Sequence, residues 1–362
     1  MNSNSSETSA SMLLRDAIRR VAVGPNRGRD ISAMEAEQIM QAVLQQRVDD
    51  LETALFFIAL RMKGESEAEY QGLFSALQAS VDTELVKVDE LYCLADPYNG
   101  YQRYLPVTPF LPAVLAACGS AALLTGVETV APKHGLTAHK VFLRAGISVT
   151  LSSNQAARSI EQVGWAYLDQ SRFADELFAL VDLRHRMVKR TALTTLERLL
   201  MPLRAEQLTH LALGYVHRAY PEIYTRLAQQ AGYASLLLVK GREGGLMPAL
   251  NKPIRNIYSR FDGHDAAFSE ESGPDMPAEL IGDTSTLAAS GNVAADAEQC
   301  LELGWAALGG EKNAMRNSLV ASAAQIVSRS PQFNSFSAAV EKVQNCLDNG
   351  SAQTRFESLT KR

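Results

Sequence analysis

The hydrophobic pattern of the chain changes once, near residue 90, and this change constrains the fold more than any other feature. Before it, apolar residues such as Ile39, Val43 and Leu44 recur at the spacing of amphipathic helices. Capping boxes at Ser32–Glu35 and Ser66–Glu69 mark helix starts, because their side chains bind amide groups that a first helical turn leaves free. The sequence therefore predicts consecutive helices over residues 12–21, 32–45, 50–62 and 66–80.

After this point, short β-prone runs alternate with helical stretches. The runs lie at residues 127–131, 148–151, 208–215 and 235–239. The helical patterns lie at 110–124, 155–163, 221–231, 294–308, 312–328 and 335–349. Such alternation is typical of a mostly parallel sheet covered by helices. We therefore predict an α/β fold with a helical domain at 12–88 and a larger α/β domain at 89–352, in which helices return near the C-terminus.

Three segments lack either pattern. Residues 1–11 are predicted to form a disordered tail and residues 353–362 a loosely held one. Residues 262–292 are rich in Ser, Gly, Asp and Ala. They are predicted to form an acidic loop with one short strand at 279–281.

Charge is unevenly distributed along the chain. The formal net charge is −5, yet residues 261–311 contain eleven acids and no Lys or Arg, which leaves 29 acids against 35 bases elsewhere. Basic residues crowd the stretch that contains Arg184, Arg186, Lys189 and Arg190. This excess is compatible with an anionic ligand or partner, and equally with a solvated helix face.

Several classes of protein are disfavoured. No apolar stretch approaches the roughly 18 residues of a membrane helix, and residues 1–11 lack the features of a signal peptide. The four cysteines lie far apart and His185, His210 and His217 share no metal-ligand spacing, so we expect core thiols, structural histidines and no metal site. No dinucleotide-binding, Walker or nucleophile-elbow motif occurs. We expect a cytoplasmic protein without a membrane span.

Lys133-His134-Gly135 follows the β-prone run at 127–131 and precedes a helical stretch that begins at His139. A cation, an imidazole and a glycine at the end of a parallel strand, followed by the free N–H groups of a helix, are typical of a phosphate site. The glycine permits close backbone approach. The same residues also fit an ordinary strand-to-helix turn.

Several further motifs occur in order along the chain. They are Arg29-Asp30-Ile31-Ser32, Ala59-Leu-Arg-Met-Lys-Gly-Glu65, Asp96-Pro-Tyr-Asn-Gly100 with Pro106-Val-Thr-Pro109, Arg190-Thr191 with Thr195-Leu-Glu197, and Glu243-Gly-Gly245. With Lys133-His134-Gly135 they make residues 15–350 resemble the anthranilate phosphoribosyltransferases of glycosyltransferase family 3, and within that family a divergent group of paralogues.

The resemblance implies a nucleoside phosphorylase/phosphoribosyltransferase-like fold, a cleft between the domains and a homodimer formed through the helical domains. It also implies transfer of a phosphoribosyl group from 5-phosphoribosyl 1-diphosphate to anthranilate, assisted by magnesium. Such chemistry needs positioned amides, cations and metal ions rather than a protein nucleophile.

The sequence departs from the family pattern where diphosphate and metal would be held. Residues 95–100 replace the glycine-rich loop and keep only Gly100, and Pro97 removes an amide donor while the tyrosine after it blocks close approach. The segment after the Lys-His-Gly turn is shortened. The acidic magnesium pair aligns with Leu246 and Met247, whose side chains cannot ligate a hard cation. The resemblance implies magnesium as a cofactor, but its usual ligands are absent, so no cofactor is predicted with certainty. We expect the standard activity to be lost.

Two functional classes remain open. In the first, the chain is a glycosyltransferase-type enzyme, a pentosyltransferase or phosphoribosyltransferase with an altered phosphosugar or acceptor. Its cleft then binds the phosphosugar or other anionic ligand through Lys133, His134, Gly135, Asn99, Gly100, Thr108, Arg190 and Glu243. In the second, a non-catalytic homodimer binds single-stranded nucleic acid in a basic groove through Tyr98, Arg103, Arg184, Arg186 and Lys189. Aromatic side chains stack on bases and cations pair with phosphates, which is the reason for the second set. No catalytic residue is predicted.

Overall fold

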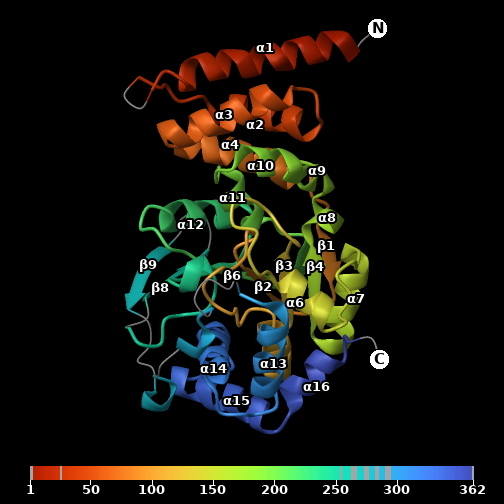
Figure 1. The fold of residues 1–362 in the computed structure, drawn as a ribbon, viewed down its shortest axis with the longest axis vertical. Helices are drawn as coiled ribbons and strands as arrows, with labels where there is room; N and C mark the ends of the chain where they lie inside the picture. Colours follow the sequence, from red (N-terminus) through yellow and green to blue (C-terminus); the bar gives the residue numbers. More distant parts are fainter. Residues whose placement is uncertain are drawn as a thin grey trace.

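A computed structural model of the chain describes residues 3–24, 27–252, 255–261, 267–272, 277–281, 285–289 and 295–360. At its N-terminal end lies a helical bundle (Figure 1), formed by α1 (Ser3–Val21), α2 (Ala33–Leu44), α3 (Asp50–Lys63) and α4 (Glu67–Ala79). Both predicted capping boxes are present, at Ser32 and at Ser66. The four predicted helices are therefore confirmed, with one correction at the N-terminus.

Helix α1 begins at Ser3, so the prediction of a disordered tail over residues 1–11 is wrong for residues 3–11. These residues are polar and show no apolar period, which is why the sequence pattern missed them. Ser11 and Arg15 bind Glu52 of α3, at 3.3 and 2.6 Å, and so attach α1 to the bundle.

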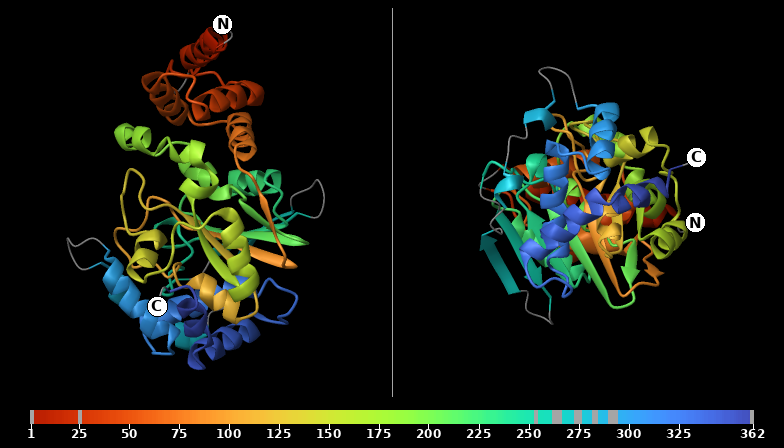
Figure 2. Two further views of the ribbon diagram at one scale, coloured as in Figure 1. Left: turned by 90° about the vertical axis from the view of Figure 1, so that its right-hand side faces the viewer. Right: turned by 90° about the horizontal axis from the view of Figure 1, so that it is seen from below.

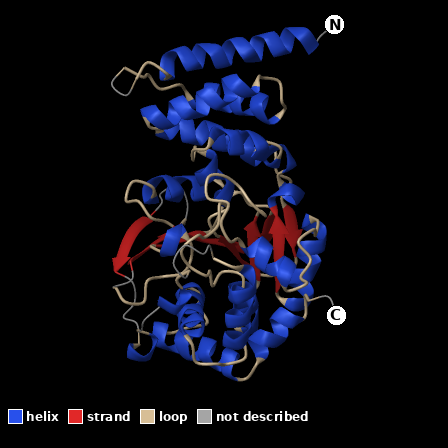
Figure 3. Ribbon diagram, in the orientation of Figure 1, coloured by secondary structure: helices blue, strands red, loops and turns tan. Residues whose placement is uncertain are grey.

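The strands are drawn in red in Figure 3. The main sheet has the strand order β4-β3-β2-β6-β7-β8-β9. The strands from β4 to β7 are parallel, and β8 and β9 are antiparallel additions. Their bounds are β2 (Glu90–Ala95), β3 (Ala122–Gly126), β4 (Trp165–Asp169), β6 (Leu208–Gly214), β7 (Ser235–Val239), β8 (Arg255–Arg260) and β9 (Ala267–Ser272). A small separate parallel pair is formed by β1 (Glu84–Val86) and β5 (Leu203–Ala205). The mostly parallel sheet of the prediction is confirmed.

Helices cover both faces of this sheet (Figures 1 and 2). Those between the strands are α5 (Leu111–Ala117), α6 (Ala138–Arg144), α7 (Ser153–Val163), α8 (Gln170–Phe173), α9 (Asp175–Phe178), α10 (Val181–Met187), α11 (Leu193–Leu196) and α12 (Pro221–Gln230). Short 3-10 turns are η1 (Glu197–Leu199), η2 (Arg242–Gly244), η3 (Ala278–Leu280) and η4 (Ser285–Leu287). The C-terminal helices are α13 (Ala297–Leu308), α14 (Ala314–Val327), α15 (Phe336–Asp348) and α16 (Ser351–Glu357).

Alternate residues of the buried strands enter different cores. Leu91 and Cys93 of β2 pack in a cluster that includes residues of the N-terminal bundle. Tyr92 and Leu94 point to the opposite face and pack with the C-terminal helices. This is the two-residue period of a strand. The helical domain therefore shares a continuous core with one face of the sheet.

Four secondary-structure predictions are wrong. The helix predicted at 110–124 ends at Ala117, and residues 122–126 form β3, because the flanking parallel strands override the helix propensity of an Ala- and Leu-rich segment. Residues 127–131 are consequently loop, and 148–151 also form no strand. The strand predicted at 279–281 is largely the 3-10 turn η3. Of the predicted acidic loop, residues 267–272 form β9 and much of the rest lies outside the described residues.

The predicted C-terminal tail is also wrong, because it contains most of α16. Phe356 is fully buried, with its ring 5.5 Å from that of Phe110 and 5.9 Å from that of Trp165. The Trp165 indole donates to the Arg355 carbonyl at 2.8 Å. The segment is thus part of the core.

The four cysteines are buried thiols, as predicted. Within the described part of the chain, no helix combines the length and the apolar character that crossing a bilayer requires.

Candidate functional site

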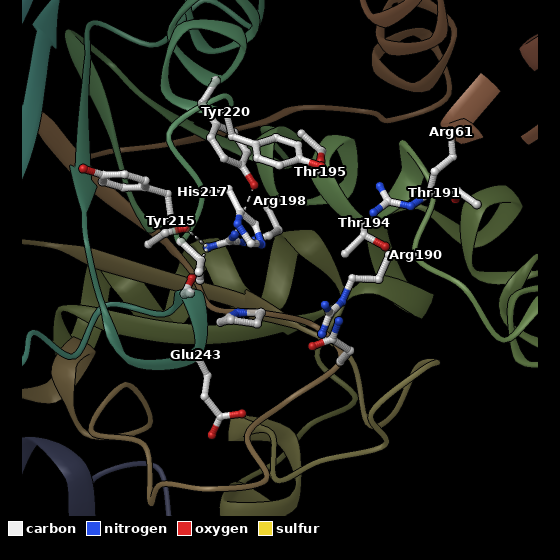
Figure 4. Close-up of a pocket in the computed structure, with 16 residues that line it drawn as sticks. Arg61, Arg190, Thr191, Thr194, Thr195, Arg198, Tyr215, His217, Tyr220 and Glu243 are labelled. Atoms are coloured by element: carbon white, nitrogen blue, oxygen red, sulfur yellow. Dashed lines mark hydrogen bonds between the residues drawn. The ribbon is translucent and has the colours of Figure 1, made fainter. Parts of the chain in front are cut away.

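A cavity lies at the carboxyl ends of β2, β6 and β7, on the side of the sheet that faces the helical domain (Figure 4). The strands β2, β3 and β4 proceed in one direction across the sheet and β6 and β7 in the other, so the cavity is at the switch point between β2 and β6. Ligands of open α/β sheets bind at such points. The cavity is lined by Arg61, Pro97, Asn99, Arg190, Thr191, Thr194, Thr195, Arg198, Gly214, Tyr215, Val216, His217, Tyr220, Tyr224, Glu243 and Gly244.

Arg198 holds the floor of the cavity together. Its buried Nη2 donates to the carbonyls of Ala95, Gly214 and Gly244, at 3.0, 3.0 and 3.1 Å. These carbonyls belong to the ends of β2 and β6 and to the turn after β7. Arg198 thus fixes the strand ends in one arrangement, and its donors at Nη2 are used by the protein itself.

Glu243 places its carboxylate in a nest of backbone amides. The consecutive N–H groups of Gln102, Arg103 and Tyr104 donate to its Oε1 at 3.2, 2.8 and 3.2 Å. Lys133 Nζ donates to its Oε2 at 2.8 Å, and the carboxylate side chain is only 1% exposed. Burial opposes ionisation, but the Lys133 ammonium and the amides outweigh it and lower the pKa of Glu243. The site therefore holds a charged carboxylate.

Lys133 is consequently not directed at solvent. Its Nζ also contacts the carbonyl of Gly100 at 3.3 Å. Burial is the main cause that lowers the pKa of Lys133, against the opposing effect of Glu243.

The two predicted glycines, Gly100 and Gly135, lie where two loops of the chain approach each other closely. A side chain at Gly135 would lie 2.4 Å from the Tyr101 carbonyl, and one at Gly100, which has φ +72°, would lie 2.6 Å from Gly135. They permit the approach of two loops rather than of a ligand.

Asn99 is the predicted ligand residue that combines a place in the cavity lining with an unpartnered buried acceptor. It is 3% exposed and lines the cavity, and its Oδ1 has no hydrogen-bond partner among the described residues. Arg190 lines the same cavity, is exposed and makes no ion pair within the described part of the chain. Arg61 reaches the cavity from α3 of the helical domain, and the Glu243 carboxylate points away from these cations (Figure 4). A residue with a buried, unpartnered acceptor and two exposed arginines thus line one cavity.

The structure brings together some of the predicted ligand residues and not others. Asn99, Arg190 and Glu243 share the cavity, whereas His134 is exposed outside its lining, with its ring 4.7 Å from that of His185. Thr108 is fully buried beside Asp96, away from the lining, so its prediction as a ligand residue is wrong.

Sequence reasoning missed Arg61, Arg198, Tyr220, Tyr224 and His217. His217, which the sequence assigned a structural role, is exposed in the lining. Two signals existed: Arg61 lies inside a quoted family motif, and Arg198 lies in the basic stretch that contains Arg190. Neither signal separates a cavity residue from a surface one.

Part of the predicted nucleic-acid set is wrong. Tyr98 is buried in a small cluster with Val127 and Val130, because the loop after β2 packs against the loop after β3. Arg184 is 3% exposed and forms a two-pronged ion pair with buried Glu197, at 2.7 and 2.8 Å.

Arg186 is exposed but is paired with Asp50 and Asp182. Arg103 and Lys189 are exposed. Arg103 Nε lies 3.9 Å from the Glu243 carboxylate, so within the described residues only Lys189 among the cations of this set makes no ion pair.

A second, basic cavity adjoins the first, and Val216 and Glu243 line both. Its lining contains Arg103, Tyr104, Val216, Lys240, Gly241, Arg242, Glu243, Ala249, Lys252 and Arg255. The only acid in this lining is Glu243, whose carboxylate is turned into the amide nest. The electrostatic field there favours anions.

The positions of the expected magnesium pair do not fit a cation. Leu246 and Met247 are each 1% exposed and belong to the apolar core, and the Leu246 amide donates to Asp96 Oδ1 at 3.3 Å. Among the described residues, no group of three or more His, Cys, Asp or Glu side chains could hold a metal ion.

Comparisons with known proteins agree with this architecture. Residues 15–81 match the model of the glycosyl transferase family, helical bundle domain, and residues 102–353 that of the glycosyl transferase family, a/b domain. An uncharacterized protein of Aquifex aeolicus is 27% identical over 69% of this chain and 75% of its own length. The uncharacterized protein YbiB of Escherichia coli is 29% identical over 71% and 81%. The structure of anthranilate phosphoribosyltransferase from Saccharomyces cerevisiae, in complex with PRPP and Mg, superposes with a TM-score of 0.76 at 14% identity, covering 96% of this chain and 97% of that one.

Proposed function

We propose, for a chain that belongs to the glycosyl transferase family with a helical bundle domain and an a/b domain, that its interdomain cavity binds an anionic, phosphorylated ligand. The observation that carries the proposal is the buried Asn99 Oδ1, which lacks a partner among the described residues and shares a cavity with Arg190 and Arg61. A buried acceptor without a partner is costly, and a hydroxyl of a bound sugar satisfies it. A guanidinium group is well suited to a phosphate.

We further propose that the chain lacks standard anthranilate phosphoribosyltransferase activity. The side chains of Leu246 and Met247 offer no oxygen to magnesium, and Pro97 offers no N–H group to a diphosphate. The amides of residues 102–104 already hold the Glu243 carboxylate. The residues present therefore do not fit the metal that assists the family's transfer.

The binding proposal is tested by calorimetric titration with ribose 5-phosphate. We expect Arg190→Ala to weaken binding about tenfold or more, since a charged hydrogen bond to phosphate is lost, and Asn99→Ala to weaken it less. Arg19→Ala, which removes an exposed arginine of α1, is the matched control. Equal binding by wild type and Arg190→Ala would contradict the proposal.

Loss of the transfer reaction is tested separately, by an assay with 5-phosphoribosyl 1-diphosphate, magnesium and anthranilate. We expect no turnover above the rate without protein. Robust turnover would refute this part and leave the binding proposal standing.

A second candidate, binding of single-stranded nucleic acid, is favoured by the basic cavity. Lys240, Lys252 and Arg255 are exposed there, next to Arg103. We expect a single-stranded oligonucleotide to bind with a steep negative salt dependence, and Lys240→Ala with Lys252→Ala to reduce both affinity and slope. No binding at low salt would remove this candidate.

We also propose that the chain is a homodimer formed through its helical domain. Large apolar side chains are exposed on this domain: Met12, Met34, Leu51, Leu55 and Met62 range from 49% to 77% exposure. Such side chains stabilise an interface when a second copy covers them.

A further inference from the structure

We propose that the amides of residues 102–104 and Lys133 form an anion-binding site of which Glu243 is a resident, exchangeable occupant, and that a phosphate-type oxyanion takes its place. This site is separate from the Asn99 and Arg190 side of the cavity and does not depend on the ligand proposed there. Glu243 thereby acts as an internal competitor for anions.

The geometry of the donors is that of an anion site rather than of a single ion pair. Consecutive amides of Gln102, Arg103 and Tyr104 converge on one oxygen within 3.2 Å, and Lys133 binds the other at 2.8 Å. Successive amides that point at one spot form a concave nest that binds anions. A phosphate oxygen satisfies the same donors as a carboxylate oxygen, and phosphate carries more charge for Lys133 and for Arg103, whose Nε lies 3.9 Å from the carboxylate.

The backbone beneath Glu243 is held independently of its carboxylate. Arg242 N–H donates to the Met247 carbonyl at 2.7 Å, Gly245 N–H donates to the Arg242 carbonyl at 3.0 Å, and Arg198 binds the Gly244 carbonyl. A side chain at Gly245 would lie 1.6 Å from the Tyr101 hydroxyl oxygen, so the turn is close-packed against the loop after β2. Exchange of the occupant therefore requires rotation of one side chain, while the nest and the turn keep their positions.

Once the Glu243 side chain rotates away, an incoming anion reaches the nest from either of two cavities. The residue lines both cavities, and cations surround it on either side: Arg61 and Arg190 in the first, Lys240, Lys252 and Arg255 in the second. These charges raise the local concentration of anions. Glu243 itself has φ 51°, a left-handed conformation that a non-glycine residue seldom adopts. The chain thus keeps a strained residue where its carboxylate fills the nest.

Resident and external anions compete, so the apparent affinity for phosphate is reduced by the fraction of molecules in which Glu243 occupies the site. Glu243→Ala removes the occupant and leaves the same φ requirement for a non-glycine residue. We expect this variant to bind inorganic phosphate at least about tenfold more tightly than wild type at constant ionic strength, measured by calorimetry, and phosphate to raise its Tm. Glu243→Gln keeps the side-chain length and removes the charge, and we expect an intermediate gain.

Three controls assign the effect to the nest. Glu128→Ala removes an exposed acid on the neighbouring loop after β3 and should leave phosphate affinity unchanged, which separates occupancy from a change in net charge. Lys133→Ala added to Glu243→Ala should abolish the gain. Arg190→Ala added to Glu243→Ala should preserve the gain, although the same change weakens ribose 5-phosphate binding if the proposed function holds.

Two results would overturn the inference. If Glu243→Ala and Glu243→Gln fold like wild type and bind phosphate no more tightly, Glu243 only secures the loop. If Arg190→Ala cancels the gain, the phosphate sits in the ligand cavity and not in the nest.

Discussion

Asp96, at the end of β2, is a buried acid whose charge should destabilise the folded chain at neutral pH. Its Oδ1 accepts from the Tyr101 hydroxyl at 2.9 Å and from the Leu246 amide at 3.3 Å. Burial raises the pKa of Asp96 from 3.8 to about 6, against the opposing hydrogen bonds from Tyr101 and from the Leu246 amide. We predict that Asp96→Asn stabilises the protein at pH 7.5, because an amide keeps the Oδ1 acceptor without the buried charge.

The raised pKa of Asp96 sets both the sign and the size of the expected change in the free energy of unfolding. Between about pH 4 and pH 6 the folded chain holds a proton on Asp96 that the unfolded chain has lost, so this group makes the free energy of unfolding fall as pH rises through that window. The shift is about two pKa units, which corresponds to roughly 3 kcal/mol. We expect a gain of roughly 1–3 kcal/mol for Asp96→Asn at pH 7.5 that shrinks toward zero near pH 4.

The assay is urea unfolding from pH 4 to 7.5, with the m-value compared at each pH to verify two-state behaviour. Asp82→Asn, at an exposed position, is the control and should give no pH-dependent difference. A loss of stability for Asp96→Asn at pH 7.5, or a difference that does not vary with pH, would refute the reasoning. It would mean that the Asp96 charge is stabilised, with the Arg198 guanidinium as one source.

Three further changes test the fold and the assembly. Phe356→Ala should lower the free energy of unfolding by about 3–5 kcal/mol, since its ring is fully buried against Trp165, and a loss below about 1 kcal/mol would mean that α16 is a dispensable tail. Burial lowers the pKa of His210 to about 4, so between pH 4 and 6.5 the imidazole is protonated in the unfolded chain but not in the folded one. The free energy of unfolding should therefore rise with pH in this window, and His210→Gln should flatten that rise in urea titrations. Leu51→Lys with Leu55→Lys should convert the proposed homodimer to a monomer in light scattering after size exclusion, and an unchanged mass would place the interface elsewhere or exclude it.

Local signals predicted the fold best where they act within one turn. The serine caps of α2 and α4 bind amides three residues away, and β7 coincides with the predicted run at 235–239. The failures have non-local causes. The segment 122–126 becomes β3 because β2 and β4 pair with it, and Phe356 is buried by Trp165, which lies almost two hundred residues earlier. No pattern within those segments contains this information.

The arginines of the candidate site show the same limit of prediction from sequence. Within a short basic stretch, Arg184 is neutralised by Glu197, Arg198 binds backbone carbonyls, and Arg190 remains exposed in the cavity. The sequence identified the stretch as a candidate anion site, but partners decide which arginine meets a ligand. Likewise Lys133 and Glu243 were both predicted ligand residues, and their contact across 110 residues could not be read from spacing.

The loop after β2, where the resemblance predicts a glycine-rich cradle, contains the amides that hold the Glu243 carboxylate. Pro97 and buried Tyr98 leave no glycine cradle after β2, yet the amides of 102–104 and Lys133 still converge on one point. Left empty, that point would hold buried donors and a partly buried ammonium without an acceptor, and such groups are costly. A carboxylate on the turn after β7 satisfies them at the expense of a left-handed residue. The chain therefore supplies the anion that the nest requires. Arg190 and Asn99 line another part of the cavity, and there an external anion meets groups that have no competing partner among the described residues.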